Sequence, residues 1–170
     1  YCFHIPAPPS PPAPFTLTID LIDLYTVSDP FPPPPKALSV MDHGADPTGQ
    51  KDSKQAFEAA LKAASRTGAS VYAPAGEFLI LGHLIMPQHQ GGLFGAGPWH
   101  TTLRGGRTVP TAVGVYAAAA SVGGSEGMAL HDLAIVGDIR ERVDDDDVNG
   151  VGGAPTAGSV IQNVFIHHTK

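Results

Sequence analysis

The spacing of hydrophobic residues predicts one amphipathic helix, over about residues 52–67. Its apolar positions follow the i, i+3, i+4, i+7 rule and are Phe57, Ala60, Leu61 and Ala64. Asp52 is the expected N-cap, Gln55 stands in the capping-box position, and Gly68 suits the position just past the C-terminus. Because the stripe is narrow and mostly alanine, we expect the helix to pack closely on a flat surface, such as the end of a β-solenoid.

Short apolar stretches separated by glycine and proline turns predict strands after this helix. They cover residues 70–73, 77–80, 83–86, 92–94, 101–103, 112–116, 128–136 and 159–167. With 20 glycines, 17 prolines and 15% charged residues, the chain has a composition typical of turn-rich β-structure. We therefore predict an all-β fold, a solenoid entered through one N-terminal capping α-helix.

An internal repeat supports stacked coils. Residues 130–135 and 161–166 share the order apolar, polar, Asx, aliphatic, any residue, Ile, at an offset of 31 residues. Residues 135–137 also resemble residues 93–95 at an offset of 42, about two coils of roughly 21 residues. We expect Asp132 and Asn163, which occupy equivalent repeat positions, to stack and hydrogen-bond along a solenoid turn, with residues 138–157 as an inserted loop.

The chain divides near residue 36. Residues 1–36 hold 11 of the 17 prolines, and residues 15–27 read as one half-buried strand. We interpret residues 1–36 as a proline-rich linker with the tail of a preceding domain, and residues 37–170 as the N-terminal part of a solenoid domain truncated after Lys170. Because solenoids need end caps, we expect the chain by itself to be inactive and marginally stable.

The charge and the apolar pattern exclude several classes of partner. The net charge of −6 and the pI of about 5.6 argue against binding to nucleic acid or to an anionic membrane. No apolar run approaches the ~18 residues that a membrane span needs. Cys2 is the only cysteine, so an internal disulfide is impossible.

Candidate chemistry gathers near the C-terminal end. Asp145, Asp147 and Asn149 reproduce the first half of a calcium loop, but Thr156 stands where a bidentate Glu is expected. A solvated turn and a loop lining a sugar-binding cleft are the alternatives. His167 is either a packed histidine or a hydrogen-bonding partner of a substrate, and Trp99 either packs or stacks on a sugar ring. No carboxylate pair suited to glycoside hydrolysis stands out.

Two resemblances cover residues 37–170. Residues 40–49, the helix and residues 73–78 resemble the N-terminal signature of the pectate-lyase-like right-handed parallel β-helix superfamily. Residues 133–137, 142–144, 149–153 and 159–170 look like the mycodextranase and α-1,3-glucanase family, glycoside hydrolase family 87. The resemblance implies a right-handed parallel β-helix, inverting hydrolysis, and catalytic aspartates in motifs that follow the segment ending at Lys170. It therefore assigns no catalytic residue here, and it places Arg142, Asp144 and Asn149 near the cleft.

These observations together predict part of a secreted α-glucan endo-hydrolase, monomeric, that binds polysaccharide and needs no cofactor. Calcium remains an open alternative at the acidic loop. Two other functions stay open: a non-catalytic glycan-binding or tailspike-like β-helix, and a pectin-acting lyase or hydrolase.

Overall fold

The computed structural model describes residues 26–82, 84, 86, 91–105, 129–137, 151 and 158–167. It contains one α-helix, one short 3-10 helix and eight strands within those ranges. In chain order they are β1 (Leu38–Ser39), η1 (Val40–His43), β2 (Thr48–Asp52), α1 (Lys54–Ser65), β3 (Val71–Ala73), β4 (Gly76–Ile80), β5 (Gly92–Gly95), β6 (Thr101–Gly105), β7 (Ala129–Val136) and β8 (Val160–His167).

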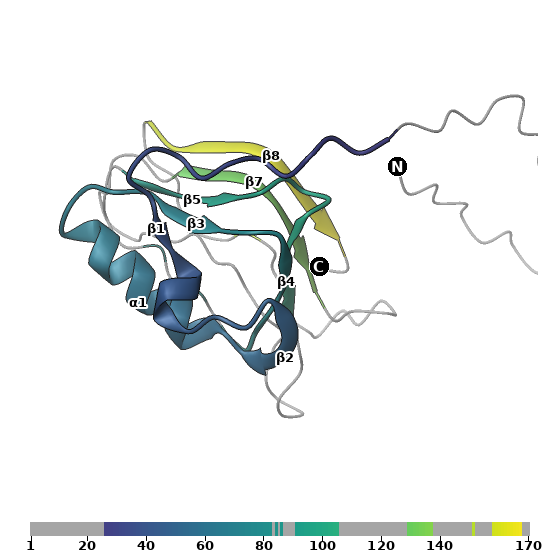
Figure 1. Ribbon diagram of the computed structural model, residues 1–170, viewed down its shortest axis with the longest axis horizontal. Coiled ribbons are helices and arrows are strands. Elements are labelled where there is room, and N and C mark those ends of the chain that lie inside the picture. The colour runs from purple at the N-terminus through teal and green to yellow at the C-terminus, as the bar shows by residue number, and fades with distance from the viewer. Residues whose placement is uncertain are drawn as a thin grey trace, which may run out of the picture.

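Every strand pairing is parallel, and the strands form two stacks. The first stack runs β1, β3, β5 and the beginning of β7, and the second runs β2, β4, β6 and the end of β7. β8 pairs along the whole of β7. Because β7 belongs to both stacks, the sheet curls around a common core (Figure 1). This arrangement confirms the predicted parallel β-helix.

The register confirms one predicted repeat and corrects the other. Leu130 pairs with Ile161 and Ile135 pairs with Ile166, which is the offset of 31 residues. The offset of 42 is wrong, because Leu93 pairs with Leu130, whereas Ile135 pairs with Leu103 in the other stack. A short apolar-apolar-glycine pattern occurs on both stacks, and the loops between strands differ in length, so such a pattern does not identify the coil.

The core fills the space inside the curled sheet. Its largest fully buried side chains come from η1, α1, β4, β5, β6, β7 and the segment after β4, and they are Val40, Phe57, Leu61, Phe78, Ile80, Leu84, Leu93, Leu103, Leu130, Leu133 and Ile135. On β8, Val164 is partly buried against this core and Ile166 is 41% exposed. The side chains of this strand therefore lie at the margin of the described core.

The helix is shorter than predicted, although its buried face is the expected one. α1 begins at Lys54, its N-cap is Ser53 without a side-chain cap bond, and Asp52 belongs to β2. The Asp52 carboxylate nevertheless accepts the N–H of Lys54 over 3.0 Å, and also that of Leu81 over 3.1 Å. The predicted capping box is therefore wrong in position, because parallel pairing extends β2 through Asp52.

The apolar stripe of α1 packs against η1, β1 and β3 at one end of the stack (Figure 1). The four predicted stripe residues are all buried, and the Phe57 ring meets the Phe78 ring edge-on, with centroids 5.3 Å apart. The helix therefore covers the first coil and closes that end of the core, as the alanine-rich stripe predicted.

The chain before β1 also contacts the solenoid. The Phe31 N–H donates to the Ala96 carbonyl over 2.8 Å, and the Tyr72 hydroxyl donates to the Phe31 carbonyl over 2.7 Å. Residues 26–34 have no regular secondary structure, and most of the predicted strand at 15–27 lies outside the described residues. The division near residue 36 stays a prediction. Of the other predicted strands, 112–116 also lies outside, and Leu84 and Met86 are buried but belong to no strand.

Candidate aromatic site

Of the sequence-predicted site residues, His167 is the one that the structure describes. Arg142, Asp144 and Asn149 lie outside the described residues, as do Asp145 and Asp147 of the candidate calcium loop. Their predicted roles stay predictions. In the ranges that the structure does describe, no three His, Cys, Asp or Glu side chains gather as a metal site would need.

His167 ends β8 on the side of the strand that faces away from the core. It lies in register with Val136 of β7, and its carbonyl accepts the Gly137 N–H over 3.0 Å. Its imidazole meets the ring of Phe165 edge-on, with centroids 5.2 Å apart and an interplanar angle of 63°. Alternation along the strand places Phe165 and His167 on the same face.

Trp99 extends this pair across the sheet. Its ring centroid lies 5.8 Å from that of Phe165 at an angle of 34°, and the residue is 65% exposed. Ala134, a small residue, stands in register between Thr102 and Phe165, which leaves space for a ring to reach across β7. We call Trp99, Phe165 and His167 the aromatic strip. Sequence reasoning considered Trp99 and His167 separately and missed Phe165, although alternation with the inward-facing Val164 and Ile166 pointed to it.

A tight turn holds Trp99 in place. The His100 N–H donates to the Gly97 carbonyl over 2.9 Å, which closes a turn with Pro98 and Trp99 at its centre. The turn is bonded to both neighbouring coils, since the Gly97 N–H donates to the Asp132 carbonyl and the Gly76 N–H donates to the His100 carbonyl, each over 2.8 Å. Backbone bonds on both sides therefore fix the position of the indole.

Buried Thr101 anchors the same turn from inside. Its hydroxyl accepts the Ala96 N–H over 2.8 Å and lies 3.1 Å from the Ala73 carbonyl and 3.0 Å from the Pro74 carbonyl. A buried hydroxyl with both its donor and acceptor roles filled stabilises its surroundings, because burying an unpaired one is costly.

A second group of aromatic side chains lies on the first stack. Tyr72, Phe94 and His131 occupy successive strands in register, and the rings of Phe94 and His131 are stacked 4.5 Å apart at 4°. Tyr72 is almost buried and is bonded to Phe31, and burial raises the pKa of its hydroxyl. This group packs side by side along the coil and is partly covered, which favours a structural role.

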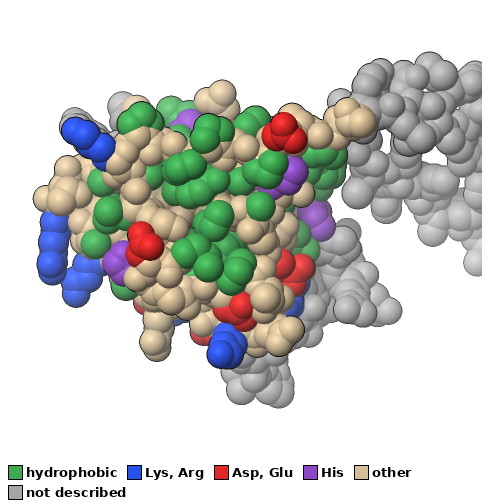
Figure 2. Space-filling view, viewed as in Figure 1, with side chains coloured by type: hydrophobic (Ala, Val, Ile, Leu, Met, Phe, Trp, Pro, Cys, Tyr) green, Lys and Arg blue, Asp and Glu red, His purple; other side chains and the backbone are tan. Residues whose placement is uncertain are grey.

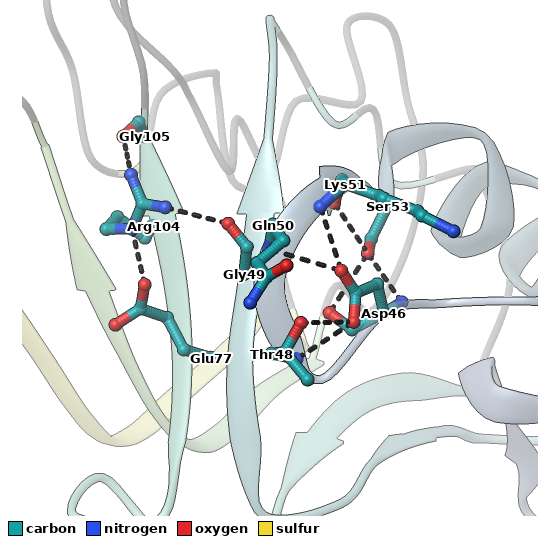
Figure 3. A network of polar contacts seen from close by, with 9 residues as sticks. All are labelled: Asp46, Thr48, Gly49, Gln50, Lys51, Ser53, Glu77, Arg104 and Gly105. Carbon is teal, nitrogen blue, oxygen red and sulfur yellow. Dashed lines mark hydrogen bonds and ion pairs between the residues drawn. The ribbon is translucent and has the colours of Figure 1, made fainter.

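The polar network around Asp46 is also structural (Figure 3). One carboxylate oxygen accepts the hydroxyl and the N–H of Thr48, at 2.7 and 3.0 Å, and the other accepts the N–H groups of Gln50 and Lys51, at 3.1 and 2.8 Å. The two bonds from Thr48 are the largest cause that lowers the pKa of Asp46 from 3.8 to about 2. Desolvation opposes them, and the N–H groups of Lys51 and Gln50 lower the pKa by smaller amounts. Both oxygens are occupied by the loop itself.

A family model for rhamnogalacturonase A/epimerase, pectate lyase-like proteins matches residues 37–169. The chain belongs to this family. The match covers the capping helix, both strand stacks and the aromatic strip. No curated protein sequence matches the chain.

Comparison with solved structures gives a more specific similarity than the family model does. The catalytic unit of a thermostable family 87 α-1,3-glucanase from Streptomyces thermodiastaticus strain HF3-3 is 35% identical, with a TM-score of 0.71, over 85% of this chain and 24% of that one. A variant of a family 87 α-1,3-glucanase catalytic domain in complex with tetrasaccharides is 25% identical, with a TM-score of 0.58, over 82% and 23%. The predicted resemblance to family 87 is confirmed.

A third solved structure shares the fold alone. PfbA, a surface adhesin of Streptococcus pneumoniae, is 20% identical, with a TM-score of 0.61, over 77% of this chain and 33% of that one. The chain spans about a quarter of the length of the glucanase structures that it matches. Of the helices in the described part of the chain, none has the length and apolar character that a membrane span requires.

Proposed function

We propose that the chain forms the first coils of a secreted α-glucan endo-hydrolase of the mycodextranase and α-1,3-glucanase type. The observation that carries the proposal is the 35% identity to an α-1,3-glucanase catalytic unit over 85% of the chain. Its β-helix is closed at one end by α1 and presents the exposed indole of Trp99 beside the partly exposed ring of Phe165 on an outer face, both of which suit a polysaccharide-binding solenoid.

The proposed reaction is inverting hydrolysis by two carboxyl groups. One protonates the leaving glycosidic oxygen, and the other activates a water on the opposite face of the sugar, which requires a separation of about 6.5–9.5 Å. We expect both groups on coils that follow β8, so the described coils supply a frame and sugar contacts rather than the proton transfers. Arg142, Asp144 and Asn149 are proposed as cleft residues, and calcium at Asp145, Asp147 and Asn149 is the alternative for that loop.

The test is an activity assay on the longer protein of which this chain is proposed to be part. We expect release of reducing sugar from α-1,3-glucan and not from polygalacturonate, with the α-linked substrate yielding products of inverted anomeric configuration by NMR. Residues 1–170 alone are the matched control and should be inactive. No hydrolysis of any α-glucan, together with no aspartate pair on the following coils, would overturn the hydrolase proposal.

A pectin-acting enzyme is the second candidate, because the matching family model is described by rhamnogalacturonases and epimerases. The net charge of −6 disfavours a polyanionic substrate. Cleavage of polygalacturonate or rhamnogalacturonan in the same assay, with α-1,3-glucan left intact, would replace the first proposal by this one.

A further inference from the structure

The exposed indole of Trp99 lies next to another aromatic ring, and hydrogen bonds hold the turn that carries it. It stands beside Phe165, which in turn meets His167, so the three rings follow one another from the turn before β6 to the end of β8. We propose that the aromatic strip is a stacking subsite for an uncharged glucose unit of an α-glucan. This inference rests on the proposed function and adds the residues that would hold the sugar.

Trp99 exposes its indole to solvent. An indole that is 65% exposed leaves much of an apolar ring in water, and contiguous exposed aromatic surface marks binding sites. The apolar faces of a sugar ring can cover such a surface, while its hydroxyl groups remain available for hydrogen bonds. Tryptophan combines this large apolar face with a polar N–H, which suits a ligand that is apolar on one side and polar at its edge.

Backbone hydrogen bonds hold the turn that carries Trp99. Four backbone hydrogen bonds hold residues 97–101: two within the turn, one from Gly76 and one to Asp132. His100 Nε2 also lies 2.7 Å from the Ser28 carbonyl oxygen. A ring that is already fixed loses little freedom when a ligand binds, so more of the contact energy remains as affinity. Free surface side chains lack this advantage.

The charges near the strip decide which sugars fit. Of the strands β4, β6, β7 and β8, only β6 carries a Lys or Arg, which is Arg104. Its guanidinium is bonded to the Glu77 carboxylate and to the carbonyls of Gly49 and Gly105 (Figure 3). Since Arg104 is neutralised by Glu77 and the whole chain is acidic, the strip favours a neutral glucose unit over a uronate.

One experiment follows from the composition, because Trp99 is the only tryptophan. The emission of residues 1–170 excited at the indole band reports this side chain alone, and near-ultraviolet circular dichroism checks that the chain is folded. We expect a saturable change with an α-1,3-linked glucose tetrasaccharide and none with tetragalacturonate. Phe165→Leu should weaken binding about tenfold, whereas Phe94→Leu, an aromatic change on the other stack, should leave it unchanged. A folded chain whose emission ignores the glucose tetrasaccharide overturns the proposal.

A kinetic experiment on the longer protein separates this inference from the proposed function. Trp99→Ala should raise KM for α-1,3-glucan about tenfold and leave kcat unchanged, as expected for a contact made equally in ground and transition states. Glucan hydrolysis with the same KM in the variant would overturn the subsite and keep the enzyme. A Trp99 response to tetragalacturonate alone would overturn both.

Discussion

The Asn163 side chain donates a hydrogen bond from Nδ2 to Oδ1 of Asp132 over 2.7 Å. The two residues lie at the same corner of successive coils, and both have a positive φ, 58° at Asp132 and 52° at Asn163. Asn and Asp tolerate this left-handed conformation better than other side chains. Each corner bends its strand from the first stack into the second, so the bond ties β7 to β8 where the sheet changes direction.

Replacing Asn163 tests this corner. Asn163→Ala removes the bond to Asp132 and places Ala at a positive φ, and we expect a loss of about 1–2 kcal/mol in the free energy of unfolding. Asn163→Gly also removes the bond but accepts the backbone angle, so it should lose less. Urea denaturation measures both. Equal losses in the two variants would mean that backbone strain does not contribute.

The close packing around Gly95 can be tested by adding a methyl group there. A Cβ on Gly95 would collide with the carbonyl oxygen of Asp132 and would lie 2.8 Å from the Leu133 Cβ. We expect Gly95→Ala to destabilise the protein by about 3 kcal/mol, since the contact is with rigid backbone. Gly68→Ala is the control, because Gly68 has open space around it and a φ of 68°; it should lose about 1 kcal/mol. A Gly95 variant no less stable than the Gly68 variant would contradict this packing.

Asp46 predicts a dependence of stability on pH. Its pKa is lowered from 3.8 to about 2 in the folded state, so its ionised form stabilises the fold fully at neutral pH, and this stabilisation is lost as the pH falls from 3.8 through 2. In Asp46→Asn only one of the two terminal side-chain atoms can accept, so either the two bonds from Thr48 or the two from Gln50 and Lys51 are lost. The variant should therefore be less stable than the parent at pH 7 and approach it at pH 2. Urea midpoints at pH 7, 4 and 2 measure this, and a constant difference would contradict it.

The capping helix is tested through its largest side chain. Phe57 is fully buried and meets Phe78 edge-on, so Phe57→Ala should cost about 3–5 kcal/mol. A double-mutant cycle with Phe78→Ala isolates the ring–ring contact, for which we expect a coupling of about 1 kcal/mol. Met41→Ala, at a 38% exposed residue of η1, is the control and should change stability by less than about 0.5 kcal/mol.

The contact between Tyr72 and Phe31 is tested by Tyr72→Phe. The variant keeps the ring and removes the hydroxyl that donates to the Phe31 carbonyl. We expect a loss of about 1 kcal/mol and faster proteolysis within residues 26–36, followed by mass spectrometry of the cleavage products. An unchanged cleavage rate would show that the bond does not hold this segment.

Hydrophobic and basic side chains occupy different parts of one face of the molecule. In the face viewed in Figure 2, hydrophobic side chains gather at the centre, and Lys and Arg side chains lie at the margin. A nucleic-acid site would instead concentrate basic groups on one face. The described residues of this face show no such concentration of basic groups at its centre.

Features set by local sequence could be predicted, whereas contacts between residues far apart in the chain could not. The buried face of α1 follows from the spacing of Phe57, Ala60 and Leu61, which depends on helical geometry alone. Its first residue was misplaced because Asp52 pairs with Leu79 on β4, a contact that no local pattern reveals. The predicted repeat at an offset of 42 residues was wrong for the same reason, because loops of unequal size set the length of each coil.

The sequence by itself determined the solenoid, its helical cap, the 31-residue repeat and the pairing of Asp132 with Asn163. Each of these depends on periodicity or on the conformational preference of a residue type, and both are written locally in the chain. Only the tertiary structure decided that Trp99 meets Phe165, residues that stand 66 positions apart. That contact depends on where the turn before β6 lies relative to β8, and parallel stacking of whole coils, rather than any local preference, sets this distance.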